Sequence, residues 1–276
     1  MNGKMERRSF LAGSLAAAGT AIGVSSATAL AADEAAGPAS GKRELYELRV
    51  YRMLRGPMLQ RADGYFQNAL LPALKRHGLG PVGVFTLMVG PDNPSYYVLI
   101  PHPSAESVVT LGSRLGADAQ YKSAAADFGK APATDPPYKM VESSLMLAAD
   151  FMPKIEVPSG AANNSPRVFE LRIYRSHSKT ANRKKIEMFG PAGELAIFRR
   201  TGLQPVFFAE TLIGSMLPNL TYMLVFPDMA TRDKNWSTFV ADPEWKKLST
   251  TPGYTDPEIV AEITNVLLRP TAYSQI

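Results

Sequence analysis

The chain has 276 residues, of which 45% are hydrophobic and 20% are charged, and this composition is typical of globular proteins with ordinary cores. Its length suits two modest domains or one large domain. The net charge of +5 falls partly on Lys4, Arg7 and Arg8, and the remainder is too small to indicate nucleic-acid binding. Because the chain has no cysteine, disulfides, thiolate metal sites and cysteine nucleophiles are excluded.

Residues 1–31 have the three parts of a twin-arginine signal peptide. The pair Arg7 and Arg8 precedes an apolar run, and small residues follow it around Ala29 and Ala31. We therefore predict export to the periplasm or the medium, with cleavage after one of these two alanines and no membrane association afterwards. A membrane anchor in the same segment is the alternative, but the run is rich in Ala, Gly, Ser and Thr, which disfavours it.

An internal repeat organises the rest of the chain. The segment Tyr46–Arg52 (YELRVYR) is echoed 123 residues later by Phe169–Arg175 (FELRIYR). Further pairs follow in the same order: His77-Gly78-Leu79 with Thr201-Gly202-Leu203, Pro81-Val82 with Pro205-Val206, and Ile100-Pro101 with Phe226-Pro227. The shared order and near-constant spacing indicate that one module has been duplicated.

Composition divides the chain into five segments. We predict a signal peptide at 1–31, a linker at 32–43, a first module at 44–150, a second linker at 151–166 and a second module at 167–276. The second linker is rich in Pro, Gly, Asn and Ser, which neither bury apolar surface nor sustain a regular hydrogen-bonded ladder.

In the first module, hydrophobic periodicity and boundary residues predict the order β-α-β-β-α-β. The expected elements are a strand at 44–52, a helix at 57–77, hairpin strands at 81–89 and 95–101, a helix from Ser104 toward Phe128, and a strand at 138–148. Pro72 lies inside the first helix and predicts a kink there, because its ring removes one hydrogen bond. Gly112 and Gly116 weaken the second helix.

The second module repeats this order. Its expected elements are a strand at 168–175, a helix at about 180–200, hairpin strands at about 204–213 and 220–226, a helix at about 229–248 and a strand at about 258–268. The order is that of the ferredoxin-like module, an antiparallel sheet with both helices on one face. We predict an α+β protein in which the two sheets pack their uncovered faces together as an intramolecular dimeric α+β barrel.

The first strand of each module carries the candidate ligand-binding residues. Because strand side chains alternate, a Glu-Arg-Tyr trio shares one face and apolar residues share the other. The trios are Glu47, Arg49 and Tyr51 in the first module, and Glu170, Arg172 and Tyr174 in the second. We expect the apolar faces to pack under the helices and the trios to line the barrel.

Two interpretations of the trios remain open. They form either a buried ion-pair network that fixes the register of the sheets, or a polar cavity whose arginines hold an anionic or carbonyl-bearing ligand.

The histidines offer little chemistry. His77, His102 and His177 are scattered without metal-ligand spacing, so we predict no metal site, and no cofactor-binding motif occurs. His77 is a weak catalytic candidate, as a proton carrier at the mouth of a cavity. Its position before Gly78 equally suits a helix-end residue that the helix dipole favours.

The YELRVYR opening, Arg76-His77-Gly78 and the terminal segment 268–274 (LRPTAYS) resemble the NIPSNAP family. Asp242–Trp245 (DPEW) is also similar to that family's late helix. The resemblance spans about residues 44–276 and implies the dimeric α+β barrel fold, but no settled shared activity. The first module differs from the second in having His77 in place of Thr201 and no evident counterpart of Asp242–Trp245.

Three functions follow as hypotheses. The first is an exported protein that binds a small molecule in the barrel through Arg49 and Arg172. The second is a cofactor-independent enzyme of the monooxygenase or isomerase kind that uses His77 or a tyrosine as acid or base. The third is a structural or partner-binding module. Homo-oligomers stay open as partners, and nucleic acid is not expected.

Overall fold

A computed structural model describes residues 42–163 and 165–276 of the chain. The predicted signal peptide and most of the linker at 32–43 lie outside these residues. Within the described ranges, none of the helices combines the length and hydropathy that crossing a membrane requires.

The first module follows the predicted order of elements, with its helices divided into shorter pieces. These elements are β1 (Leu45–Arg52), α1 (Pro57–Tyr65), the π-helical segment η1 (Phe66–Leu70), α2 (Leu71–Arg76), β2 (Gly83–Leu87), β3 (Ser95–His102), α3 (Ala105–Ala117), α4 (Ala119–Ala124), α5 (Ala126–Gly129) and β4 (Met140–Ala148). The π-helical segment ends two residues before Pro72, whose missing N–H interrupts the α-helical ladder. The predicted distortion at this proline is therefore present.

The second module has the same order. Its elements are β5 (Val168–Arg175), α6 (Lys179–Phe189), α7 (Glu194–Arg200), β6 (Gln204–Ile213), β7 (Asn219–Phe226), α8 (Met229–Ala241), α9 (Pro243–Ser249), α10 (Asp256–Ile259) and β8 (Glu262–Pro270). The helix expected at about 180–200 is interrupted between α6 and α7, where Gly193 has a φ of 96°. Glycine adopts this left-handed conformation without steric cost.

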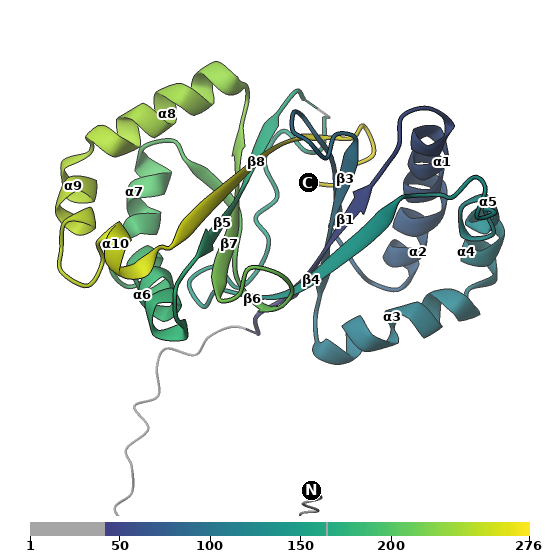
Figure 1. Ribbon diagram of the computed structural model, residues 1–276, viewed down its shortest axis with the longest axis horizontal. Helices are drawn as coiled ribbons and strands as arrows, with labels where there is room; N and C mark the ends of the chain where they lie inside the picture. Colours follow the sequence, from purple (N-terminus) through teal and green to yellow (C-terminus); the bar gives the residue numbers. More distant parts are fainter. Residues whose placement is uncertain (1–41, 164) are drawn as a thin grey trace, which may run out of the picture. The chain divides into compact units, whose positions relative to one another are not determined.

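The eight strands of the described residues close into one antiparallel barrel in the order β1-β3-β2-β8-β5-β7-β6-β4. The modules join where β2 pairs with β8 and where β4 pairs with β6. Helices α1 to α5 cover one side of the barrel and α6 to α10 cover the other (Figure 1). The predicted α+β fold with a closed barrel built from two repeats is confirmed.

On β1 and β5, the face expected to pack under the helices lies inside the barrel, and the face expected to line the barrel lies under the helices. Apolar residues from both modules form one cluster inside the barrel, among them Tyr46, Leu48, Phe169 and Leu171. Tyr51 instead belongs to the cluster under the first module's helices, and Tyr174 to the cluster under the second module's. The prediction that the Glu-Arg-Tyr trios line the barrel is therefore wrong.

The trios lie outside the barrel because of the size and the composition of the barrel interior. An eight-stranded barrel leaves an interior just wide enough for side chains to fill. A charged side chain there would need partners that the apolar opposite wall does not supply. On the outer face, the helices and loops of each module provide such partners.

The strand register also corrects one part of the repeat alignment. Ile100 of β3 lies opposite the glutamate of β1, and Leu224 of β7 lies opposite the glutamate of β5. Ile100 therefore corresponds to Leu224 rather than to Phe226. His102 then takes the place that Phe226 has in the second module.

The first module does have a counterpart of Asp242–Trp245. Asp118 accepts a hydrogen bond from the backbone N–H of Tyr121 at the start of α4, and Asp242 accepts one from Trp245 at the start of α9. Each aspartate also pairs with the arginine near the end of its module's first helix, at 2.6 Å in the first module and 2.7 Å in the second. The prediction that the first module has no counterpart of Asp242–Trp245 is therefore wrong.

Candidate functional site

Arg49 and Glu47 form the polar centre of the first module's outer sheet face. Nε and Nη2 of Arg49 each donate a 2.7 Å hydrogen bond to one oxygen of the Glu47 carboxylate. Ser143 of β4 donates a third, at 3.0 Å. The carboxylate therefore fixes the arginine in a bidentate geometry, the strong form of this pair.

His102 lies behind this pair and is fully buried. Its Nε2 is 3.6 Å from Glu47 Oε2, and its Nδ1 is 3.0 Å from Ser107 Oγ. Burial alone would raise the pKa of Glu47, but the neighbouring His102 and Arg49 outweigh burial and lower the pKa to about 2. Glu47 is thus ionised at neutral pH.

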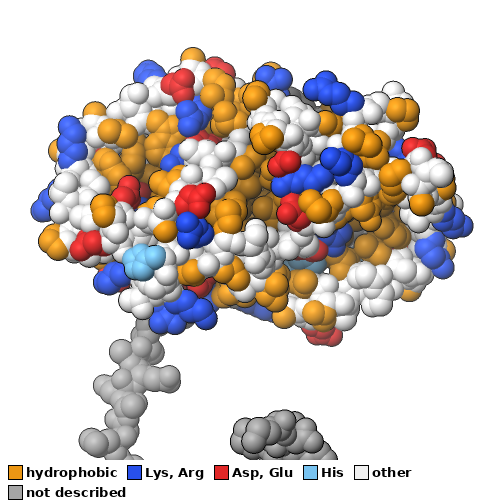
Figure 2. All heavy atoms as spheres, viewed as in Figure 1, with side chains coloured by type: hydrophobic (Ala, Val, Ile, Leu, Met, Phe, Trp, Pro, Cys, Tyr) orange, Lys and Arg blue, Asp and Glu red, His pale blue; other side chains and the backbone are white. Residues whose placement is uncertain are grey.

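A pocket of about 360 Å³ opens over Arg49, between β1, β4 and the helices of the first module. Half of its lining residues are aromatic. The lining residues are Arg49, Tyr51, Tyr65, Tyr121, Phe128, Gly129, Pro137, Tyr138, Val141 and Ser143. Figure 2 shows a recess walled by hydrophobic side chains between the barrel and these helices. We call this the Arg49 pocket.

Tyrosine hydroxyls supply the other polar groups of the pocket. The hydroxyls of Tyr65 and Tyr121 are 3.0 Å apart, and the Tyr65 ring stacks on Phe128 with 4.0 Å between centroids. Burial raises the pKa of both Tyr51 and Tyr65. These two hydroxyls therefore stay protonated and are suited to donate hydrogen bonds rather than to act as bases.

Arg49 remains a cation in this setting. Burial tends to lower its pKa, but the hydrogen bonds to Glu47 outweigh burial and raise the pKa. A guanidinium edge, protonated hydroxyls and aromatic rings together can hold a planar molecule through stacking and through an oxygen acceptor.

The second module holds the same trio in a closed arrangement. Arg172 donates a 2.7 Å hydrogen bond to Glu170 and a 2.9 Å hydrogen bond to the hydroxyl of Tyr174. The hydroxyl of Tyr222 in turn donates to Tyr174 at 3.0 Å. Tyr222 lies opposite Arg172 in the sheet, whereas Val98 lies opposite Arg49, so the second module has an additional hydroxyl.

Helix α8 completes the closure. Arg232 binds both oxygens of Glu170 at 2.8 and 2.9 Å, and the indole N–H of Trp236 donates to the same carboxylate at 2.9 Å. The Trp236 ring also lies 4.5 Å from the Arg172 Cζ atom, in cation–π contact. Side chains of the module itself thus occupy the polar centre.

The first module has small or apolar residues at the equivalent helix positions. Helix α3 begins after its cap Ser104 and α8 begins after its cap Asp228, so Val108 corresponds to Arg232 and Gly112 corresponds to Trp236. A Cβ atom on Gly112 would meet nothing within 4 Å. The indole that covers Arg172 therefore has no equivalent over Arg49.

The second module also contains a buried ion pair between Lys185 and Glu194, which has no equivalent in the first module. The Lys185 ammonium is 3.0 Å from Glu194, and both side chains are almost fully buried. The ammonium also lies over the rings of Tyr174, Phe189 and Trp245 at 4.7 to 5.8 Å. Phe66 of η1 aligns with Phe189 of α6 at the repeat offset of 123 residues. Ala62 of the first module therefore takes the place of Lys185.

The six predicted ligand-binding residues thus form two separate groups, one under the helices of each module. Only Arg49 and Tyr51 line the Arg49 pocket. His77 lies at the end of α2 with its Nε2 3.6 Å from Asp118, and it does not line this pocket. Within the described part of the chain, no three His, Asp or Glu side chains are grouped to hold a metal ion.

Sequence reasoning did not identify His102, Tyr65, Tyr121 or Ser143 as neighbours of the trio. Ser143 and His102 lie on the strands that flank β1, on its outer face. A strand register would have found both, since side chains on one face of adjacent strands are neighbours. Tyr65 and Tyr121 carried no comparable signal, because the helix packing that brings them together is not encoded locally.

Comparison with known proteins supports the fold and identifies the family. A putative monooxygenase from Lactobacillus acidophilus is 9% identical with a TM-score of 0.54, and the match covers 84% of this chain and 97% of that one. A putative monooxygenase from Fusobacterium nucleatum is 8% identical with a TM-score of 0.53, over 83% and 92% of the two chains. At such low identity, these similarities concern the fold alone.

A NIPSNAP-like domain protein from Burkholderia xenovorans is 22% identical over 39% of this chain and 88% of its own, with a TM-score of 0.35. No curated protein matches the chain. The NIPSNAP family itself matches residues 46–135 and 169–275, which is more than half of the chain and includes both modules. The chain therefore belongs to the NIPSNAP family.

Proposed function

We propose that this chain is an exported protein that binds a small planar molecule with an anionic or carbonyl oxygen in the Arg49 pocket. The first module, and not the barrel interior, is the binding site in this proposal. The signal-like sequence at residues 1–31 supports export to the periplasm or the medium.

One observation carries the proposal: the same arginine is covered in one module and lines a pocket in the other. Trp236 lies over Arg172, while Arg49 lines an aromatic pocket of about 360 Å³. That volume is within the range of small-molecule sites, which are mostly apolar with few polar groups. A ligand ring would stack on the tyrosines while its oxygen accepts from Arg49.

Titration of the purified protein with 4-nitrophenol tests this proposal, because the absorbance of the probe reports transfer of its phenolate to a cationic site. We expect saturable binding that depends on Arg49. Arg49→Met should weaken binding at least tenfold, since the methionine keeps the apolar volume but removes the donor.

Arg52→Met is the matched control. Arg52 lies on the same strand, pairs with Asp92 and Glu142, and does not line the pocket. Equal affinity in Arg49→Met and in the wild-type protein would refute the site, provided that circular dichroism shows both to be folded.

The second candidate function is cofactor-independent oxygenation or isomerisation of a ligand in the same pocket. The shared fold of the two putative monooxygenases is the observation that favours it. Against it, the buried tyrosine hydroxyls stay protonated, and His77 lies away from the pocket. Oxygen uptake with a panel of hydroquinones, lost in Arg49→Met, would favour this function over binding alone. If no probe binds at all, the structural or partner-binding role is favoured instead.

A further inference from the structure

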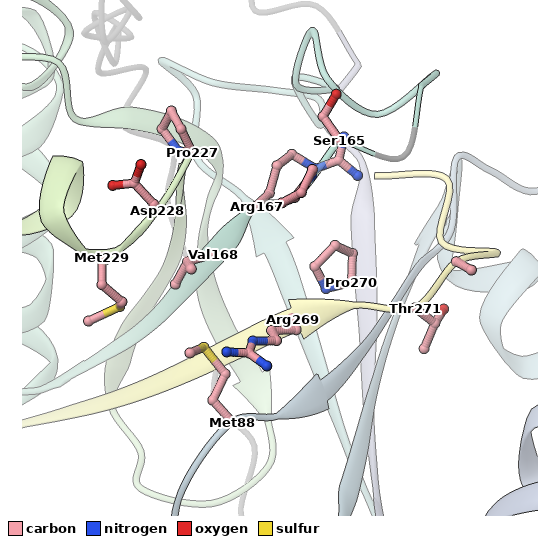
Figure 3. A pocket seen from close by; sticks show the side chains of 12 residues that line it. Met88, Ser165, Arg167, Val168, Pro227, Asp228, Met229, Arg269, Pro270 and Thr271 are labelled. Carbon is pink, nitrogen blue, oxygen red and sulfur yellow. The ribbon is translucent and has the colours of Figure 1, made fainter.

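A larger pocket, of about 570 Å³, shares no lining residue with the Arg49 pocket. It lies where the start of β5 meets the ends of β7 and β8, with Met88 joining from the residue after β2 (Figure 3). We call it the Arg269 pocket. Nothing in the proposed function uses it.

Arg167 is the unusual residue of this pocket. It is only 7% exposed, yet its Nε and Nη1 have no hydrogen-bond partner among the described residues. Its Nη2 makes one long contact, 3.5 Å, with the backbone carbonyl of Ile276. Burial removes hydration from this guanidinium, and the protein replaces only part of it, through the Ile276 oxygen and the Phe169 ring 5.8 Å away.

Arg269 adds a second, accessible positive charge. It lies on the strand next to Arg167, since Phe169 of β5 pairs with Leu268 of β8. In the described part of the chain, neither arginine forms a salt bridge with an Asp or Glu side chain, although Arg167 contacts an oxygen of Ile276. Figure 3 shows the two arginines with Pro270 between them.

The one carboxylate that lines the pocket is already engaged. Asp228 caps α8, and its Oδ1 accepts a 2.7 Å hydrogen bond from the backbone N–H of Thr231. The positive ends of the first peptide dipoles of the helix offset part of its charge. The pocket therefore keeps a net positive character despite Asp228.

Apolar side chains form the rest of the walls, chiefly Met88, Met229 and Pro227. We propose that the Arg269 pocket binds a small organic anion, a carboxylate or a phosphate ester, whose apolar body packs against these side chains. Arg269 contacts the anionic group directly. Arg167 adds a second positive charge, which no Asp or Glu side chain in the described part of the chain pairs with and which is effective in a medium of low dielectric constant.

Differential scanning fluorimetry and calorimetric titration with benzoate, phenyl phosphate and benzyl alcohol at constant ionic strength test this site. Benzoate, phenyl phosphate or both should raise the Tm and bind saturably, and benzyl alcohol should do neither; the two anions distinguish a carboxylate from a phosphate ester. Arg167→Met should weaken anion binding at least tenfold, because it removes one of the two positive charges of the pocket.

Arg269→Gln keeps the test decisive if Arg167→Met does not fold, because Arg269 is exposed and its loss should leave folding intact. It should also weaken anion binding at least tenfold. Arg43→Gln, at an arginine that pairs with Asp150 beside a different pocket, is the control and should bind as the wild type does. Equal binding of benzyl alcohol and the anions, or unchanged anion affinity in Arg269→Gln, would overturn the proposal.

Discussion

The two modules place the same Glu-Arg-Tyr trio on the same strand and surround it differently. In the second module, Arg232 and Trp236 bind Glu170, and the trio is closed off by its own chain. In the first module, strand residues Arg49, Ser143 and His102 surround Glu47, and Arg49 lines a pocket. The same trio is therefore closed by a helix in one module and left beside a pocket in the other, depending on the side chains of the helix that covers it.

The largest expected effect is on the closed trio. Glu170→Gln removes the charge that Arg172 and Arg232 both bind, and it leaves two buried or half-buried cations without their partner. Breaking a buried ion pair in this way costs about 3–5 kcal/mol of the free energy of unfolding. Urea denaturation followed by circular dichroism measures this loss.

Glu262→Gln is the matched control for that substitution. Glu262 pairs with Arg175 at 3.0 Å, but both side chains are substantially exposed. Such surface pairs contribute about 1 kcal/mol or less. If the two substitutions cost the same, the closed trio does not have the structural role that distinguishes the modules.

The second prediction concerns how the free energy of unfolding depends on pH through Glu47, in the trio of the first module. The pKa of Glu47 is about 2 in the folded protein against an ordinary value of 4.5, so its ionised form stabilises the fold. Because the folded pKa is the lower one, this stabilisation is fully present above pH 4.5 and is lost as the pH falls toward 2. It amounts to at most about 3 kcal/mol.

Unfolding of the wild-type protein and of Glu47→Gln between pH 7 and pH 2 tests this dependence. The two proteins should differ most at neutral pH and converge below pH 4.5. A difference that stays constant over the whole range would mean that Glu47 is not held in its ionised form by Arg49 and His102.

The third prediction converts the open module toward the closed one. Gly112→Trp places an indole at the position of Trp236, where a side chain meets no obstacle at Cβ. We expect binding of 4-nitrophenol to weaken at least tenfold, which corresponds to about 1.4 kcal/mol. The titration designed for Arg49→Met measures this change.

Gly112→Ala separates occlusion from helix stabilisation. Alanine is favoured over glycine inside a helix by up to about 1 kcal/mol, so this variant should be more stable than the wild type and bind the probe equally well. Weakened binding in both variants would show that the conformation of α3, and not the cover over Arg49, controls the pocket.

The sequence predicted the architecture well because periodicity and repetition are local signals. The alternation in Tyr46–Arg52 defined the strand, and its echo at Phe169–Arg175 revealed the second module. Alternation cannot say which face points inward, and here the choice between barrel and helices was made wrongly. That choice depends on what the opposite wall offers, which only the closed structure reveals.

The candidate site was predicted only in part for a related reason. The residues of each trio share one strand face, as the alternation predicted, but their partners come from distant positions such as Ser143 and Trp236. The sequence also predicted a difference between the modules at Asp242 that the structure does not have. That prediction arose because Asp118 and the residues after it do not repeat the DPEW letters. Capping requires only the aspartate and the backbone that follows it.

The smallest expected effect tests that similarity between the modules. Asp118→Ala and Asp242→Ala each remove a helix cap and an arginine partner, and Asp118 and Asp242 are similarly shielded, with side chains 10% and 12% exposed. Each substitution should cost about 1 kcal/mol, the usual value for loss of a cap, and the two costs should agree. Urea denaturation of both variants measures them. A clear excess at Asp242 would indicate that the second module depends more on its helix cap than the first does, so that the asymmetry extends beyond the trios to the helix ends.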